Sequence, residues 1–168
     1  MQEKWNNPSQ QGDAFYSRSN GADPSILVHR KNEDGTAGER PPLFSGILPG
    51  DYTRIASTAR IKEFSRGELL YIEGDSVQQV LLLTSGVAKI TQLGMSGTEV
   101  ILRFGVTGDV LGATGLFCTG RHCTTAEAFR PCRALVWDAP SFKALVERFP
   151  VLHQNLSLIH ISEPTRPY

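Results

Sequence analysis

The sequence predicts a mainly β domain, a sandwich or barrel of short strands flanked by short helices. Seven short apolar runs rich in β-branched and aromatic residues follow one another, namely Ile61–Phe64, Leu69–Ile72, Val80–Leu83, Val87–Leu93, Val100–Phe104, Ala126–Phe129 and Ala134–Trp137. Glycines separate many of these runs at the spacing typical of all-β folds. The runs are interpreted as strands, because they are too short and too often interrupted by glycine to form helices.

A short helix is predicted ahead of the strands, over residues 51–59. Its apolar face has i, i+3, i+4 spacing at Tyr52, Ile55 and Ala56. Asp51 can cap the first turn of this helix. Within two of the predicted strands, Val87–Leu93 and Val100–Phe104, polar residues alternate in part with apolar ones. Such alternation indicates antiparallel sheets with one face partly open to water.

Two helices are predicted after the strands. Apolar residues with helical spacing follow Pro140, namely Phe142, Leu145, Val146 and Phe149. Pro150 ends this first helix, because proline lacks a backbone donor and clashes with the preceding turn. A second helix is expected from Val151 through Leu156, and the prolines at positions 164 and 167 prevent it from running far.

The 168 residues suit one domain with short extensions. Residues 1–42 are rich in Gly, Pro, Ser and Asn and hold a single aliphatic cluster, so they are expected to form a disordered leader. Residues 43–156 contain the apolar residues of a real core and are expected to form the folded domain. Residues 157–168 are interpreted as a short tail with a non-native or frame-shifted ending.

Charge and cysteine content limit the partners and the location. Lys plus Arg number 17 and Asp plus Glu number 17, so no net positive field attracts nucleic acid and DNA binding by this chain alone is not expected. No signal peptide or long apolar span is visible, and no membrane partner is expected. Three clustered cysteines are too few for the framework of a small secreted protein and indicate a cytoplasmic protein. We expect them to be buried structural residues, and thiol sensing by the pair Cys118 and Cys123 is the alternative.

Several segments carry a more specific pattern: Phe64–Asp75, Leu83–Ile90, Gly97–Leu102, Gly108–Gly112 and Gly115–Phe117. In this order they resemble the cyclic-nucleotide-binding domain of the Crp/Fnr family of bacterial transcription regulators. The resemblance covers residues 43–156. It implies a double-stranded β-helix (jelly roll) with short flanking helices and a core that holds an effector.

The resemblance also implies where the effector lies. The stretch 112–125 corresponds to the family's phosphate-binding cassette, in which a Glu binds the ribose and an Arg binds the phosphate. Ala113 stands at the position of the Glu and Cys123 at that of the Arg, so both charged anchors are missing. Arg121 lies two residues before Cys123 and would point to the same face of an extended strand. The candidate binding residues are Gly112, Ala113, Thr114, Arg121, His122, Cys123, Thr124 and Thr125.

Three interpretations of this pocket remain open. The first is a cyclic nucleotide bound in the usual manner, weakened because each lost charge-assisted contact costs about 1.5–3 kcal/mol. The second is a different small effector, for example an anion held by Arg121, His122, Thr124 and amides at a helix N-terminus. The third is a pocket filled by its own side chains. The effector is not identified, and no metal site is expected, because His122 and Cys123 have no further ligands at a suitable spacing.

No catalytic motif is present, so an enzyme is not expected. The chain is interpreted as the effector-sensing domain of a Crp/Fnr-type regulator, truncated before the helix-turn-helix. DNA would then be bound only through a missing C-terminal domain, and the helix starting near Val151 would support a homodimer. The alternative is a stand-alone small-ligand-binding or protein-interaction module without DNA binding.

Overall fold

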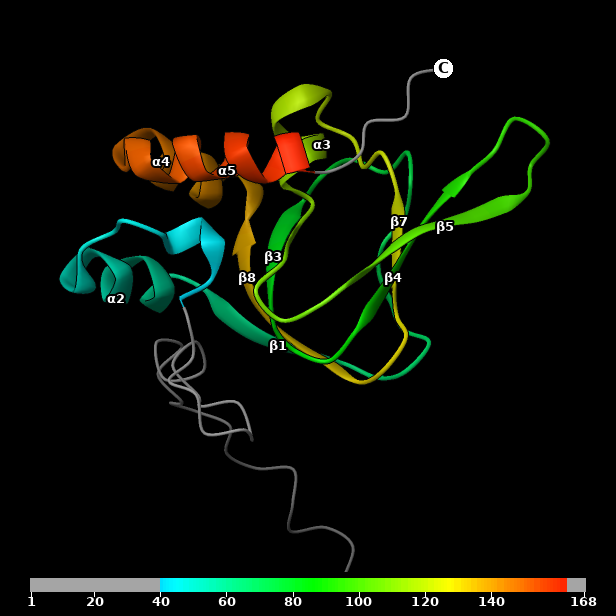
Figure 1. Cartoon of the computed structure of the whole chain (residues 1–168), viewed down its shortest axis with the longest axis horizontal. Helices are drawn as coiled ribbons and strands as arrows, with labels where there is room; N and C mark the ends of the chain where they lie inside the picture. Colours follow the sequence, from blue (N-terminus) through cyan, green and yellow to red (C-terminus); the bar gives the residue numbers. More distant parts are fainter. Residues whose placement is uncertain (1–39, 163–168) are drawn as a thin grey trace, which may run out of the picture.

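The computed structural model describes residues 40–162 and shows two four-stranded antiparallel sheets with short helices packed beside them (Figure 1). The first sheet has the order β1 (Arg60–Phe64), β8 (Cys132–Asp138), β3 (Gln79–Ser85) and β6 (Val110–Leu111). The second has the order β2 (Leu69–Tyr71), β7 (Thr125–Ala128), β4 (Ala88–Leu93) and β5 (Glu99–Gly105). The mainly β fold class predicted from the sequence is confirmed.

All seven predicted strands are present, with ends that differ by one or two residues. One further strand, β6, is present in the structure and was not predicted from the sequence. It is only two residues long, which is too short for any alternation of apolar and polar positions to be visible. Its strand character comes from antiparallel pairing with β3, in which Leu81 faces Leu111 and Leu82 faces Val110.

The helix α2 (Pro49–Ser57) begins two residues earlier than predicted, because Pro49 occupies the first turn, where its fixed φ suits a helix. Asp51 lies in this first turn but makes no side-chain capping bond, so the predicted cap is wrong. A short 3-10 helix, η1 (Pro42–Phe44), precedes α2, and α3 (Ala113–Cys118) lies between β6 and β7.

Two further helices follow β8, as predicted. The helix α4 (Ala139–Arg148) ends just before Pro150, where α5 (Pro150–Ser162) begins. The expectation that the last helix ends at Leu156 is wrong, because α5 continues through Ser162. Leu156 is buried and Ile159 packs against the same core, and no proline occurs until position 164.

The core has two layers on the two faces of the first sheet. Leu81, Leu83 and other residues face the second sheet, whereas Val80, Leu82 and Trp137 face the helices. A strand buried on both faces has few polar positions, which explains the uninterrupted apolar run Val80–Leu83. The Trp137 indole Nε1 donates a hydrogen bond to Thr58 Oγ1 at 3.0 Å and thereby ties the sheet to the end of α2.

The described chain begins at Arg40. Its Nη1 donates to the backbone oxygen of Ile47 at 2.6 Å, and η1 already begins at Pro42, so residues 40–42 belong to the folded structure. The expected leader otherwise falls in residues 1–39, which lie outside the described residues, as do 163–168. Within residues 40–162, no helix has the length and apolar character that a membrane span requires.

Candidate ligand-binding cavity

A cavity of about 120 Å³ lies where β4, β5 and β6 meet α3 and the loop that follows it. Its lining consists of Tyr71, Ile90, Leu102, Arg103, Val110, Leu111, Gly112, Thr114, Gly115, His122, Cys123 and Thr124. Aliphatic side chains from the strands supply one part of this lining. Hydroxyl groups, a thiol, an imidazole and one guanidinium supply the rest, so the cavity has an apolar part and a polar part.

Two glycines allow the loop after α3 to pack closely on the helix. Gly112 has φ +89°, a left-handed conformation, and a Cβ there would lie 3.0 Å from the backbone oxygen of Gln79. At Gly115 a Cβ would lie only 2.3 Å from the backbone oxygen of Arg121. No side chain fits at either position without a shift of the backbone. Gly112 and Gly115 therefore allow residues 121–124 to reach the cavity.

The same loop is attached to the turn between β2 and β3. The backbone N–H of Gly74 donates to the oxygen of His122 at 2.8 Å, and the N–H of His122 donates to the oxygen of Asp75 at 2.9 Å. The Arg121 guanidinium Nη1 donates to the backbone oxygen of Gly74 at 2.7 Å. These three bonds hold the backbone of the loop in place, and the third holds the Arg121 side chain on the turn.

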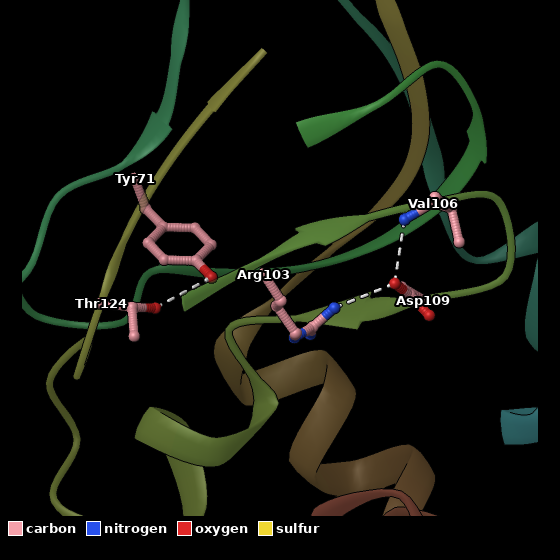
Figure 2. A network of polar contacts seen from close by, with 5 residues as sticks. All are labelled: Tyr71, Arg103, Val106, Asp109 and Thr124. Carbon is pink, nitrogen blue, oxygen red and sulfur yellow. Dashed lines mark hydrogen bonds and ion pairs between the residues drawn. The ribbon is translucent and has the colours of Figure 1, made fainter. Parts of the chain in front are cut away.

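His122 and Tyr71 form a planar wall of the cavity. Their rings are stacked, with centroids 4.0 Å apart and planes at 7°. His122 is only 7% exposed. Burial lowers the pKa of His122, and the carboxylate of Asp75 opposes this effect only in part. The imidazole is therefore neutral near pH 7. The Tyr71 hydroxyl lies 3.5 Å from Thr124 Oγ1, which is a weak hydrogen bond (Figure 2).

Arg103 supplies the permanent positive charge of the lining. Its Nη1 donates to Asp109 Oδ2 at 3.0 Å, and the same oxygen accepts the backbone N–H of Val106 at 2.9 Å (Figure 2). The side chains of Arg103 and Asp109 are 31% and 34% exposed. Asp109 is not among the lining residues, and none of the described residues that line the cavity is a carboxylate. Arg103 therefore enters the lining as one member of an ion pair, whose carboxylate lies outside the lining.

The structure brings five of the predicted binding residues together in the lining: Gly112, Thr114, His122, Cys123 and Thr124. The other three lie outside it. Ala113 packs into the core beneath the helices, and Thr125 Oγ1 accepts the backbone N–H of Glu73 at 3.0 Å. The Arg121 side chain does not line the cavity, contrary to the strand geometry assumed for it, because its guanidinium binds Gly74 on the adjacent turn.

Sequence reasoning missed the cavity residues that precede the cassette, in particular Tyr71 and Arg103. A signal for Arg103 was available, because it is a lone charged residue inside the apolar run Val100–Phe104. The expectation of buried cysteines holds only for Cys132, since Cys118 and Cys123 are exposed. Within the described residues, no group of three or more His, Cys, Asp or Glu side chains could hold a metal ion.

Comparison with known proteins shows the family to which the chain belongs. The chain matches the model of the cyclic nucleotide-binding domain over residues 61–149, just over half of its 168 residues. It is 25% identical over 118 residues to the cyclic AMP receptor protein of Thermus thermophilus, covering 70% of this chain and 55% of the relative. It is 26% identical over 137 residues to a putative potassium channel protein of Rhodopseudomonas palustris, covering 80% of this chain and 33% of the relative.

The fold agrees with this match. The crystal structure of the catabolite activator protein of Thermus thermophilus superposes with a TM-score of 0.67 at 24% identity, covering 71% of this chain and 56% of that one. The chain thus spans about half the length of the cyclic AMP receptor protein that it matches. By sequence and by fold, the chain belongs to the cyclic nucleotide-binding domain family.

Proposed function

We propose that this chain is the effector-sensing domain of a Crp/Fnr-type regulator, and that its cavity takes a small effector other than a cyclic nucleotide bound in the usual manner. The observation that carries the proposal is the cavity itself, which lies at the cassette segment and is lined by Thr114, Thr124 and other polar groups. The cassette keeps the glycines that shape it while its two charged anchors are replaced. Such a pocket suits a ligand of different chemistry.

The size of the cavity supports this choice. An apolar cavity of about 150 Å³ in another protein binds benzene. A cavity of about 120 Å³ therefore suits a ligand of similar size. A cyclic nucleotide combines a base, a sugar and a phosphate and is several times larger than benzene. Its usual partners are also missing, because Ala113 and Cys123 cannot supply charge-assisted hydrogen bonds.

A pocket closed by its own side chains has less support. The loop over α3 is closely packed, yet space remains beneath it beside Leu102 and Val110. Gly112 and Gly115 are required by the backbone geometry that keeps the loop in this position. We therefore favour a ligand-binding cavity over a vestigial one.

We propose that another part of the regulator produces the response to the effector. The relative named as a cyclic AMP receptor protein is about twice as long as the matched region, and we propose that DNA binding belongs to a part of the parent protein beyond this sequence. Dimer formation through α5 and a cytoplasmic location are part of the same proposal. The similarity to a putative potassium channel protein favours a second candidate, a ligand-binding module coupled to an output other than DNA.

A thermal-shift screen of the full chain tests the proposed sensing function. Cyclic AMP, cyclic GMP, cyclic dinucleotides and small organic acids are compared, because a ligand that binds only the native state raises the melting temperature. Leu102→Trp is the control, since Leu102 is 40% exposed and lines the cavity, so that a larger side chain at this position is expected to block the cavity. We expect a small acid to stabilise the wild type and not this variant. The proposal would be contradicted if micromolar cyclic AMP stabilised the wild type, or if none of the compounds did.

A further inference from the structure

We infer that His122 binds the polar group of the effector, and that the effector is a compact apolar molecule with one uncharged hydrogen-bond donor, such as the hydroxyl group of a phenol. The inference rests on the proposed function, because it assigns a ligand class to the same cavity. Among small acids it selects weak ones, which keep their proton near pH 7 as the phenol group of tyrosine does.

The ring nitrogens of His122 lack the hydrogen bonds that buried polar groups usually make. The backbone of His122 is bonded on both sides, since its N–H donates to Asp75 and its oxygen accepts from Gly74. The side chain differs: within the described part of the chain, no residue forms a hydrogen bond or an ion pair with either ring nitrogen. His122 is nevertheless only 7% exposed. Most buried polar side-chain atoms have a hydrogen-bond partner, so the imidazole has capacity left for a ligand.

The imidazole ring lies at the edge of the cavity. His122 and Gly112 both line it, and a Cβ at Gly112 would lie 3.3 Å from His122 Cε1 and 3.9 Å from His122 Nδ1. The glycine therefore leaves room for this edge of the ring. The stack with Tyr71, at 4.0 Å between ring centroids, restricts the orientation of the ring. The cavity thus joins a buried imidazole to an apolar wall that includes Ile90 and Val110.

The surroundings of the ring decide which kind of group it can bind. Burial lowers the pKa of His122 and keeps the imidazole neutral near pH 7, so one ring nitrogen is a donor and the other an acceptor. His122 also lines a second hollow of about 190 Å³, together with Asp75. The carboxylate of Asp75 attracts the ring proton and favours the tautomer whose N–H is nearer to it. The other nitrogen is then an acceptor, which a hydroxyl donor fits.

A charged ligand suits this cavity less well. The Arg103 guanidinium is already paired with the Asp109 carboxylate at 3.0 Å, so its charge does not require an anion. A buried cation would need a carboxylate partner, and none of the described residues that line the cavity is one. An uncharged ligand avoids the cost of desolvating a charge, while its apolar body covers Ile90, Leu102 and Val110. Phenol combines a benzene-sized body with one hydroxyl donor and is therefore the probe.

Calorimetry of phenol binding to the full chain tests the inference, with toluene as the matched ligand. Toluene has a methyl group in place of the hydroxyl, so it keeps the shape of phenol and lacks the donor. His122→Phe keeps an aromatic ring beside Tyr71 and has no acceptor. We expect phenol to bind the wild type, and the ratio of the phenol affinity to the toluene affinity to fall about ten-fold in His122→Phe, as expected when one hydrogen bond is lost.

His153→Phe is the matched control for this variant. It makes the same chemical change at an exposed residue of α5 that lies outside the lining of the cavity, so the ratio should equal that of the wild type. If it falls as far as in His122→Phe, the effect is not local and the inference is wrong.

Two further variants guard against misfolding of His122→Phe. His122→Leu also removes both ring nitrogens, and the same fall in the ratio is expected. His122→Gln restores an acceptor oxygen on a different side chain, so its ratio should lie between those of the wild type and His122→Leu. The melting temperature of each variant is measured in parallel.

The possible failures are distinguishable. If the ratio is the same in the wild type as in His122→Phe and His122→Leu, the ring nitrogens bind water and not the ligand; the inference is then wrong, and ligand sensing stands. If benzoate binds the wild type more tightly than phenol does, the uncharged class is wrong. If no compound of the screen, with phenol included, stabilises the wild type, the proposed function fails together with this inference.

Discussion

Replacing Gly115 by alanine measures how closely α3 and the loop above it are packed. An alanine Cβ at this position would lie 2.3 Å from the backbone oxygen of Arg121 and 3.0 Å from Val77 Cγ2. A backbone oxygen cannot rotate away as the end of a flexible side chain can, so the loop over residues 119–124 would have to move off the helix. We expect the free energy of unfolding to fall by about 1–3 kcal/mol, the usual cost of overpacking.

Gly50 provides a matched control for this substitution. It also lies in a helix, in the first turn of α2, and no atom comes within 4 Å of an added Cβ. Alanine has a higher helix propensity than glycine, so Gly50→Ala should stabilise the protein by up to about 1 kcal/mol. The same chemical change is thus predicted to have opposite signs at two helical sites, and only the space around the new methyl group differs.

Urea denaturation followed by circular dichroism gives the free energy of unfolding for both variants and the wild type. If the free energy of unfolding has the same slope against urea concentration in all three proteins, the substitutions change stability and not the surface exposed on unfolding. The reasoning would be refuted if Gly115→Ala were as stable as the wild type, or if both variants were stabilised. Because Gly115 also lines the cavity, loss of ligand binding in a variant that remains folded would show that the loop has moved.

Three further predictions concern the site and its partners. Burial lowers the pKa of His122, so the unfolded chain binds a proton more readily than the folded one. The free energy of unfolding should therefore fall as the pH decreases below the ordinary histidine pKa of about 6.5. Urea titrations at pH 5 and pH 7.5 should show a smaller fall for His122→Gln than for the wild type. Cys123→Arg adds a guanidinium to the lining, at the position that the resemblance gives to the phosphate-binding Arg, and should leave the affinity for cyclic AMP unchanged in calorimetry, because the cavity is too small for the nucleotide. A gain of about ten-fold or more would contradict the size argument. The chain has 17 basic and 17 acidic residues and should not shift a duplex DNA probe at physiological salt; micromolar binding that weakens steeply with salt would contradict this expectation.

Most of the fold was predictable because its signals are local. The alternation of side chains in a strand, the break that Pro150 makes between two helices and the turn at Gly97 with φ +77° all depend on residues close in sequence. Two of the differences in the elements, at β6 and at the end of α5, have the opposite cause. The strand β6 exists through its pairing with β3, and the last turns of α5 depend on contact with a core built from distant residues.

The candidate site divides in the same way. The resemblance together with residue identity predicted that the family's charged anchors are missing, because Ala113 and Cys123 stand at their positions and neither is a Glu or an Arg. Which basic residue reaches the cavity was decided by tertiary structure. Arg121 is held on Gly74 by the loop, whereas Arg103 enters the lining because of a bulge in the β4–β5 pair. The register of a strand depends on a partner many positions away in sequence, so no local pattern encodes the direction in which this arginine points.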